Sequence, residues 1–298
     1  MLQVLITNGM YPDYEKNEMV KANIGMQDGK IAYIGKNAPE EKPERILDGA
    51  GMVLMPGLVN CHTHLPMSLL RGYGEELPLS EWLSRSIFPQ EERMDARSVK
   101  AAALLSIAEC LRFGVTSVSD MYFCSDAVAE AVAESGIKAN LCHAVTTDRT
   151  DDFDPDTGPD FREAEALHDK WHGYDDGRIR VDCGIHAEYT STYPAWEALS
   201  KYALENGLGM QLHLSETKQE QEDCEERSGL TPAQRSCVLG VQANLWTEYI
   251  PTFSQAEYML LPRLSALAET GWSLDRKDYP DYVRRVRRLA GLYDVCGY

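Results

Sequence analysis

Residues 56–72 read PGLVNCHTHLPMSLLRG and lie where the pattern of the chain changes. The stretch 53–64, VLMPGLVNCHTH, has the apolar character of a buried strand and ends in His62-Thr63-His64. Side chains two residues apart on a strand point to the same face, so both imidazoles can reach one ion. Two histidines at this spacing are often unrelated. Their place at the end of a strand strengthens the case, because parallel barrels carry their chemistry at the C-terminal ends of strands.

Downstream of this stretch, apolar strands alternate with helical segments. Strands are predicted at 114–121, 137–146, 179–187 and 208–216, and helices at 98–113, 125–135 and 194–206. In the first of these helices Ala103, Ile107, Ala108 and Leu111 repeat at helical spacing. The alternation predicts an α/β fold with a parallel sheet, either a barrel or a doubly wound sheet. About five strand–helix units precede residue 234, whereas a complete eight-unit barrel needs about three more.

Upstream of the stretch, residues 1–52 have a different pattern of short strands joined by turns. VLITNG (4–9) is followed by VKANIGMQDGKIAYIG (20–35), in which Asp28-Gly29 separates two alternating runs. An Asp-Gly pair in this context is a strong signal for a β-hairpin. We therefore expect a separate N-terminal β segment over residues 1–52.

Two more histidines end predicted strands, His186 in IRVDCGIHA and His213 in LGMQLHLSE. Each alone could be a core or surface histidine that forms an ordinary hydrogen bond. Three strand ends with histidines in one parallel architecture instead predict a shared metal site. Glu216, three residues after His213, adds a carboxylate that can act on water at a metal.

These residues carry a resemblance to a known family. PGLVNCHTHLPMSLLRG resembles the signature of metal-dependent amidohydrolases, and HAEYTS followed by QLHLSET resembles their methylthioadenosine/S-adenosylhomocysteine deaminase branch. The resemblance covers residues 1–234. It implies a partial TIM-type (β/α) barrel over residues 53–234, preceded by a small β-sandwich-like segment.

The resemblance also implies roles for individual residues. It makes His62, His64 and His213 the ligands of one divalent metal ion, zinc or a similar ion, and gives Glu216 the role of proton shuttle. Glu91 in IFPQEERM and His186 would contact the substrate, and Arg149 in TTDRTDD lies where the family holds the substrate's tail. The implied reaction is hydrolytic deamination of an adenosine-type nucleoside, of the methylthioadenosine or S-adenosylhomocysteine class.

The end of the chain does not continue this resemblance. The family has a histidine on its sixth barrel strand and an aspartate at the end of its eighth, but no histidine follows His213. Residues 238–273 instead resemble the end of the catalytic barrel of bacterial β-N-acetylhexosaminidases, in which Trp246 and Glu248 would bind sugar. The alternative for residues 238–273 is a strand followed by a helix, without a role in sugar binding.

Charge changes at the same place. Residues 1–234 carry 21 Lys+Arg against 40 Asp+Glu, whereas residues 235–298 carry 8 against 7. We therefore expect a third segment, 235–298, and a junction near Gln234 that makes the chain an apparent chimera. Deaminase activity would be impaired by the missing barrel end, and unpaired strand edges would favour self-association.

Composition bounds the partners. A net charge of −18 argues against nucleic acid or an anionic membrane as partner and favours a small-molecule substrate. No apolar run approaches the roughly 20 residues that span a bilayer. No secretory signal is apparent, and the eight cysteines lack paired spacing, which predicts a cytoplasmic protein with reduced thiols.

Three readings remain open. The leading one is a metal-dependent deaminase by ancestry, probed best by its metal content. The second is an inactive chimeric product. The third, a hexosaminidase fragment, ranks last because glycoside hydrolysis needs two positioned carboxyl groups and the motifs supply only Glu248.

Overall fold

The computed structural model divides into two compact units, Met1–Leu58 and Val59–Tyr298. The residues that the structure describes are 2–40, 42–74, 77–147, 153–156, 158–214, 216, 219–220, 240–246, 250–272 and 278–297.

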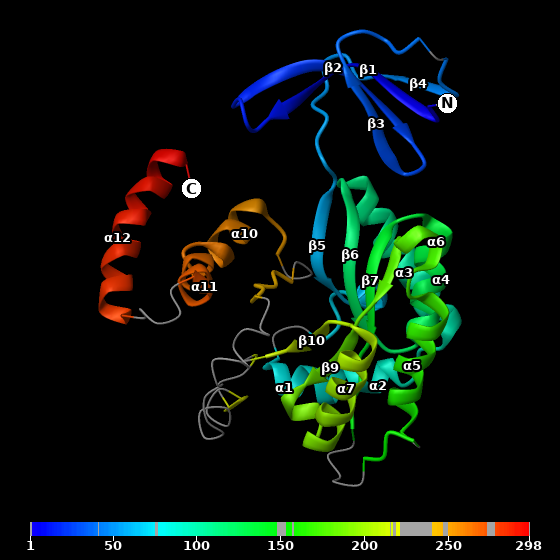
Figure 1. Ribbon diagram of the computed structural model, residues 1–298. Helices are drawn as coiled ribbons and strands as arrows, with labels where there is room; N and C mark the ends of the chain where they lie inside the picture. Colours follow the sequence, from blue (N-terminus) through cyan, green and yellow to red (C-terminus); the bar gives the residue numbers. More distant parts are fainter. Residues whose placement is uncertain are drawn as a thin grey trace. The chain divides into compact units, whose positions relative to one another are not determined.

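The first unit contains one four-stranded sheet, whose strands lie in the order β3-β2-β1-β4 (Figure 1). Strand β1 pairs antiparallel with β2 and parallel with β4, and β2 pairs antiparallel with β3. The second sheet that a β-sandwich over residues 1–52 would require remains a prediction. The four strands are β1 (Val4–Asp13), β2 (Glu18–Gln27), β3 (Lys30–Gly35) and β4 (Arg45–Asp48).

The turn between β2 and β3 confirms the predicted hairpin. Gln27 pairs with Lys30 across it, and Asp28 and Gly29 have φ angles of 51° and 69°. Two consecutive residues with positive φ form the turn that matches the twist of a two-residue hairpin, and Asp-Gly tolerates it at low cost.

The second unit begins with strands that alternate with helices, as the sequence pattern predicts. One sheet has the order β5-β6-β7-β8, in which β6, β7 and β8 run parallel. A second, parallel pair joins β9 to β10, and a single bridge between Val145 and Ile185 links the two sheets. The strands are β5 (Leu58–Thr63), β6 (Val115–Tyr122), β7 (Lys138–His143), β8 (Ile179–Val181), β9 (Cys183–Ala187) and β10 (Met210–His213).

The helices after β6, β7 and β9 return the chain to the start of the next strand, which makes this unit an α/β fold (Figure 1). The long helices of this part are α3 (Ala96–Arg112), α4 (Ser125–Ser135), α5 (Pro159–Trp171) and α7 (Tyr193–Asn206). Shorter helical turns are η1 (Leu65–Leu70), α1 (Leu79–Glu81), η2 (Trp82–Ile87), α2 (Phe88–Glu91), α6 (Tyr174–Gly177) and η3 (Glu188–Thr190).

Helix α3 shows how local sequence sets these boundaries. Asp95 caps its first turn by accepting a hydrogen bond from the backbone N–H of Ser98. The Ser98 hydroxyl accepts a hydrogen bond from the backbone N–H of Asp95, which completes a capping box. Ala103 and Ile107 are buried as predicted, whereas Leu111 is 43% exposed. Helix α4 ends at Gly136, whose φ of 80° is the left-handed conformation expected of a glycine stop.

Two apolar clusters hold the second unit together. The larger packs α3 and α4 against β6 and β7, with Val99, Ile107, Val118, Val128 and Leu141 all at most 1% exposed. The smaller surrounds β9 and joins it to α5 and α7. Because helices cover the strands in this way, the carboxyl ends of the strands are held in fixed positions.

Further along the described part of the chain lie the helices α10 (Phe253–Leu260), α11 (Arg263–Trp272) and α12 (Tyr279–Cys296). The predicted junction at Gln234 lies outside the described residues. Among the helices that the structure describes, none combines the length and apolar character needed to cross a bilayer.

Candidate metal centre and surrounding pocket

Three histidines from two strands gather at one point of the second unit. His62 lies near the end of β5, His64 directly follows that strand, and His213 is the last residue of β10. One ring nitrogen from each lies within 4.8 Å of the others. The centroids of the His62 and His213 rings are 4.7 Å apart, although 151 residues separate them in the chain. Strand ends predicted to converge therefore do so in space.

The hydrogen bonds indicate which nitrogens are available. His64 Nδ1 bonds the backbone carbonyl of Met121. A carbonyl only accepts, so Nδ1 carries the proton and Nε2 keeps its lone pair. That Nε2 lies 3.1 Å from Nε2 of His213. A tetrahedral zinc ion with bonds of about 2.0–2.1 Å separates its ligand nitrogens by roughly 3.3 Å.

His62 supplies an independent sign of a missing partner. Its Nε2 is buried and has no hydrogen-bond partner among the residues that the structure describes. A buried nitrogen without a partner is costly, so such groups usually have an unseen ligand. The three imidazoles therefore fit a divalent cation that accepts nitrogen ligands.

Burial keeps these rings neutral. It lowers the pKa of His62 to about 4, with a further contribution from His213, and lowers the pKa of His64 well below its ordinary value. Burial also lowers the pKa of His213. Neutral imidazole is the form that binds metal, so the site is prepared for a cation at neutral pH.

Glu216 lies beside this cluster. Its Oε1 is 3.7 Å from Nδ1 of His213, and its Oε2 accepts a hydrogen bond of 3.0 Å from the hydroxyl of Tyr189. Burial raises the pKa of Glu216, Glu220 raises it further, and the Tyr189 bond opposes the shift. A carboxyl group with a raised pKa holds a proton more readily than an ordinary carboxyl group, which suits a group that takes up and passes on protons.

Two of the three predicted substrate contacts, His186 and Glu91, are among the residues that the structure describes. The His186 ring lies 5.3 Å from that of His213, and its Nδ1 is 2.9 Å from the Thr190 hydroxyl. Glu91 Oε1 accepts a 2.6 Å hydrogen bond from Tyr122, and burial raises the pKa of Glu91 against that bond. Arg149 lies outside the described residues.

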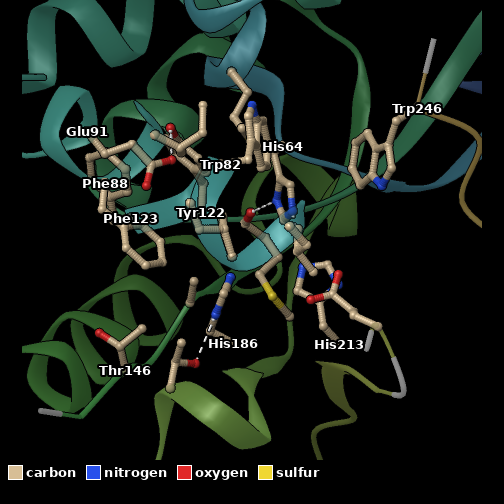
Figure 2. Close-up of a pocket in the computed structure, with 18 of the residues that line it drawn as sticks. His64, Trp82, Phe88, Glu91, Tyr122, Phe123, Thr146, His186, His213 and Trp246 are labelled. Carbon is tan, nitrogen blue, oxygen red and sulfur yellow. Dashed lines mark hydrogen bonds and ion pairs between the residues drawn. The ribbon is translucent and has the colours of Figure 1, made fainter. Parts of the chain in front are cut away.

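A cavity of about 1710 Å³ opens beside the histidines. His64, His186, His213 and Glu216 contribute to its lining, and Glu91 lies across it (Figure 2). Trp82, Phe88, Tyr122 and Phe123 line much of the rest. Aromatic walls with a few convergent polar groups are typical of sites for small aromatic ligands.

Several contributors were not predicted from the sequence. Tyr122 and Tyr189 donate hydrogen bonds to the carboxyl groups of Glu91 and Glu216, and Asp120 underlies the histidine strand. Tyr189 lies within HAEYTS, a stretch that carries the family resemblance, so that motif could have pointed to it. For Asp120 the available signal was a carboxylate near the end of the apolar strand GVTSVSDM.

Trp246, predicted as a sugar-binding wall, lies against the histidines in this structure. Its ring stacks on His64 with centroids 5.3 Å apart and planes 10° from parallel. Its proposed companion Glu248 lies outside the described residues. The contact adds a further aromatic wall to the pocket.

Comparisons with known proteins point in the same direction. The family model described as "Amidohydrolase family" matches residues 53–285, which extends past Gln234. A 5-methylthioadenosine/S-adenosylhomocysteine deaminase of Thermoanaerobacter pseudethanolicus is 37% identical over 227 residues, 76% of this chain and 52% of the relative. A 5'-deoxyadenosine deaminase of Methanosarcina acetivorans is 34% identical over 232 residues, 77% of this chain and 52% of the relative.

A solved structure is similar over the same region. An adenosine deaminase of Xanthomonas campestris with bound zinc superimposes with a TM-score of 0.67 at 31% identity, covering 78% of this chain and 54% of that one. The chain thus spans about half the length of the relatives that it matches.

Proposed function

The chain belongs to the amidohydrolase family, and we propose that it is a metal-dependent hydrolytic deaminase of adenosine-type nucleosides. The observation that carries the proposal is the convergence of His62, His64 and His213, with ligand atoms within 4.8 Å, at the edge of an aromatic cavity. The names of the deaminase relatives support the substrate class, methylthioadenosine or S-adenosylhomocysteine.

We propose His62, His64 and His213 as ligands of one divalent ion, with zinc favoured because a structural relative contains it. Such an ion supplies a nucleophile at neutral pH by lowering the pKa of bound water to about 7. The Met121 carbonyl fixes the tautomer of His64, which keeps its Nε2 available to a cation.

Glu216 is the proposed proton carrier. Deamination needs one proton at the ring nitrogen of the purine and another at the departing ammonia. Glu216 can take one proton from the attacking water and pass it to the ring nitrogen, then take the second from the same oxygen and pass it to the departing ammonia. Its raised pKa and the Tyr189 bond to its second oxygen suit it to this role. Its closeness to His213 supports a role at the reacting end of the cavity.

The proposed substrate contacts lie around the same cavity. Glu91, held by Tyr122, is positioned to accept hydrogen bonds from sugar hydroxyls, and His186 lies close enough to His213 to contact the base. Arg149 is proposed for the substrate's tail from the resemblance alone.

The remaining proposals concern the end of the chain. We propose the segments 1–52, 53–234 and 235–298, with a partial barrel in the second and a hexosaminidase-like third segment that impairs deamination. Exposed apolar side chains of the terminal strands β5 and β10, among them Val59 at 62% and Leu212 at 37%, are consistent with the proposed self-association.

Ammonia release from 5'-methylthioadenosine tests the function. The zinc-loaded chain is compared with a hybrid whose residues 235–298 are replaced by the matching end of the Thermoanaerobacter relative, and with Glu216→Gln in that hybrid. We expect the hybrid to be active, the glutamine variant to be about 10²–10⁴-fold slower, and the present chain to fall far below the hybrid.

Two results would contradict the proposal in different places. A hybrid that holds metal but releases no ammonia refutes the deaminase assignment of residues 1–234. A present chain as fast as the hybrid refutes the proposed impairment and leaves the deaminase assignment standing.

A further inference from the structure

Strand β6 carries a buried carboxylate next to the histidine cluster. Asp120 is 2% exposed and is neither one of the three proposed ligands nor one of the residues that line the cavity. Its Oδ1 accepts two short hydrogen bonds, 2.7 Å from the Thr63 hydroxyl and 2.6 Å from the backbone N–H of Leu65. Burial of a carboxylate costs free energy unless its partners offset the loss of hydration. The two hydrogen bonds to Asp120 therefore point to a structural role for this residue.

The two donors are the immediate neighbours of His64 in the chain. Thr63 precedes it and Leu65 follows it, so a single oxygen bonds the side chain of the residue before one proposed ligand and the backbone of the residue after it. The Thr63 hydroxyl also lies 3.2 Å from the Ser119 carbonyl, and the Met121 carbonyl bonds the His64 ring. Three consecutive residues of β6 therefore contact the same short stretch.

The position of His64 in the chain explains why additional contacts to its neighbours are useful. His64 lies just past the end of β5, where the chain leaves the sheet and enters the 3₁₀ turn η1. Its own side chain forms no cap for that turn. Regular strand structure thus ends one residue before a proposed ligand, and Asp120 supplies a constraint on both neighbours of that ligand.

We propose that Asp120 is a positioning residue for the metal centre, which sets the backbone of His64 through Thr63 and Leu65. The inference rests on the proposed function, because it assumes that His64 is a metal ligand. Groups that orient metal ligands typically change metal affinity by 10–100-fold when removed.

Two substitutions distinguish the hydrogen-bond acceptor of Asp120 from its negative charge. Asp120→Ala removes Oδ1 and leaves the Leu65 N–H without its partner. Asp120→Asn keeps an oxygen at the same place, so it can still accept from both donors. Asp182→Ala is a matched control. Asp182 also accepts from a backbone N–H, that of Gly209 at 2.9 Å, and from Asn140 at 2.6 Å, but it contacts neither neighbour of His64.

The readout is the Zn²⁺ dissociation constant of the purified full chain, measured by competition with a chromophoric chelator, together with urea unfolding of the metal-free proteins. We expect Asp120→Ala to bind Zn²⁺ 10–100-fold more weakly, Asp120→Asn to stay within about threefold of the unchanged chain, and Asp182→Ala to do the same even where it unfolds at lower urea. The visible spectrum of bound Co²⁺ should change in Asp120→Ala alone.

The outcomes distinguish the inference from its premise. If the unchanged chain binds no metal, the proposed metal centre fails and the inference with it. If the unchanged chain binds Zn²⁺ and Asp120→Ala binds it equally well, only the positioning role fails. Equal loss of affinity in Asp120→Ala and Asp182→Ala would assign the effect to general destabilisation and also overturn the role. Where Asp120→Ala does not fold, Thr63→Val against Thr63→Ser makes the same test at one of the two donors.

Discussion

The histidines of the site differ in which of their ring nitrogens have hydrogen-bond partners. His64 Nδ1 is engaged by a backbone carbonyl, His186 Nδ1 lies beside the Thr190 hydroxyl, and His62 Nε2 is buried without a partner. A buried ring nitrogen without a partner among the described residues gains much from a cation. This nitrogen sets His62 apart from His186, whose Nδ1, like that of His64, already has a partner.

Replacement of His62 by alanine should therefore weaken Zn²⁺ binding by more than about 100-fold, beyond the usual effect of an outer group. His186→Ala is the matched control, since it removes a neighbouring ring with a similarly low pKa of about 4. We expect it to leave Zn²⁺ affinity within a few-fold of the unchanged chain. Dissociation constants from chelator competition decide the matter, and equal effects of the two substitutions would contradict the ligand assignment.

Asp120 also predicts a pH dependence of stability. Burial raises its pKa to about 7 against the hydrogen bonds from Leu65 and Thr63. Because the folded pKa exceeds the unfolded value near 3.8, this group's contribution to stability is complete below about pH 4 and is lost as pH rises through 7. Asparagine at this position cannot ionise and should not show the loss.

The metal-free Asp120→Asn protein should thus gain in unfolding free energy relative to the unchanged chain as pH rises from 4 to 7.5, by up to about 4 kcal/mol. Urea unfolding in the presence of a chelator measures the gap at each pH. A gap that stays constant, or narrows toward pH 7.5, would show that Asp120 ionises normally.

At the scale of elements, local sequence accounts for the regular parts well. The Asp28-Gly29 hairpin, the burial of Ala103 and Ile107, and the stop at Gly136 follow from turn chemistry and helical spacing. These features depend on residues close together in the chain, which is why they are predictable without a structure.

The connection between β5 and α3 was less predictable. It contains the short elements η1, α1, η2 and α2 instead of one long helix. Pro66, Pro78 and Pro89 interrupt it, and Gly72 and Gly74 have φ angles of 78°. Prolines and glycines mark breaks, but the path between breaks depends on distant contacts such as the bond between Glu91 and Tyr122, 31 residues apart.

The candidate site divides along the same line. His62, His64, His213 and Glu216 could be placed from strand ends and a family motif. Asp120 and Tyr122 could not, because their roles depend on which residues face them after folding. Sequence spacing indicates which groups reach a strand end, but not which groups hold them there.

The cap of α3 offers a test at this scale. Asp95→Ala removes the acceptor of the Ser98 N–H, 2.8 Å away, and should lower the free energy of unfolding, because an uncapped helix end is less stable. Asp95→Asn, which keeps a capping oxygen, should cost clearly less. Urea unfolding of the three proteins compares them, and an alanine variant as stable as the unchanged chain would show that the capping box contributes nothing to stability.

At the scale of the whole molecule, a site assembled at the ends of strands β5 and β10 belongs to a chain that spans about half the length of its relatives. The family model matches residues 53–285, while the proposed change of pattern begins near Gln234. Activity is therefore a demanding test of the whole chain, whereas metal binding depends chiefly on residues up to 216.

The central claim is that this chain holds one divalent ion on three histidines. The most direct measurement is equilibrium dialysis of the purified, metal-free chain against Zn²⁺, with metal and protein quantified in the same samples. The account predicts one tightly bound Zn²⁺ per chain, and none at the same free Zn²⁺ when His62, His64 and His213 are all replaced by alanine. No binding to the unchanged chain, or undiminished binding to the triple variant, would contradict it.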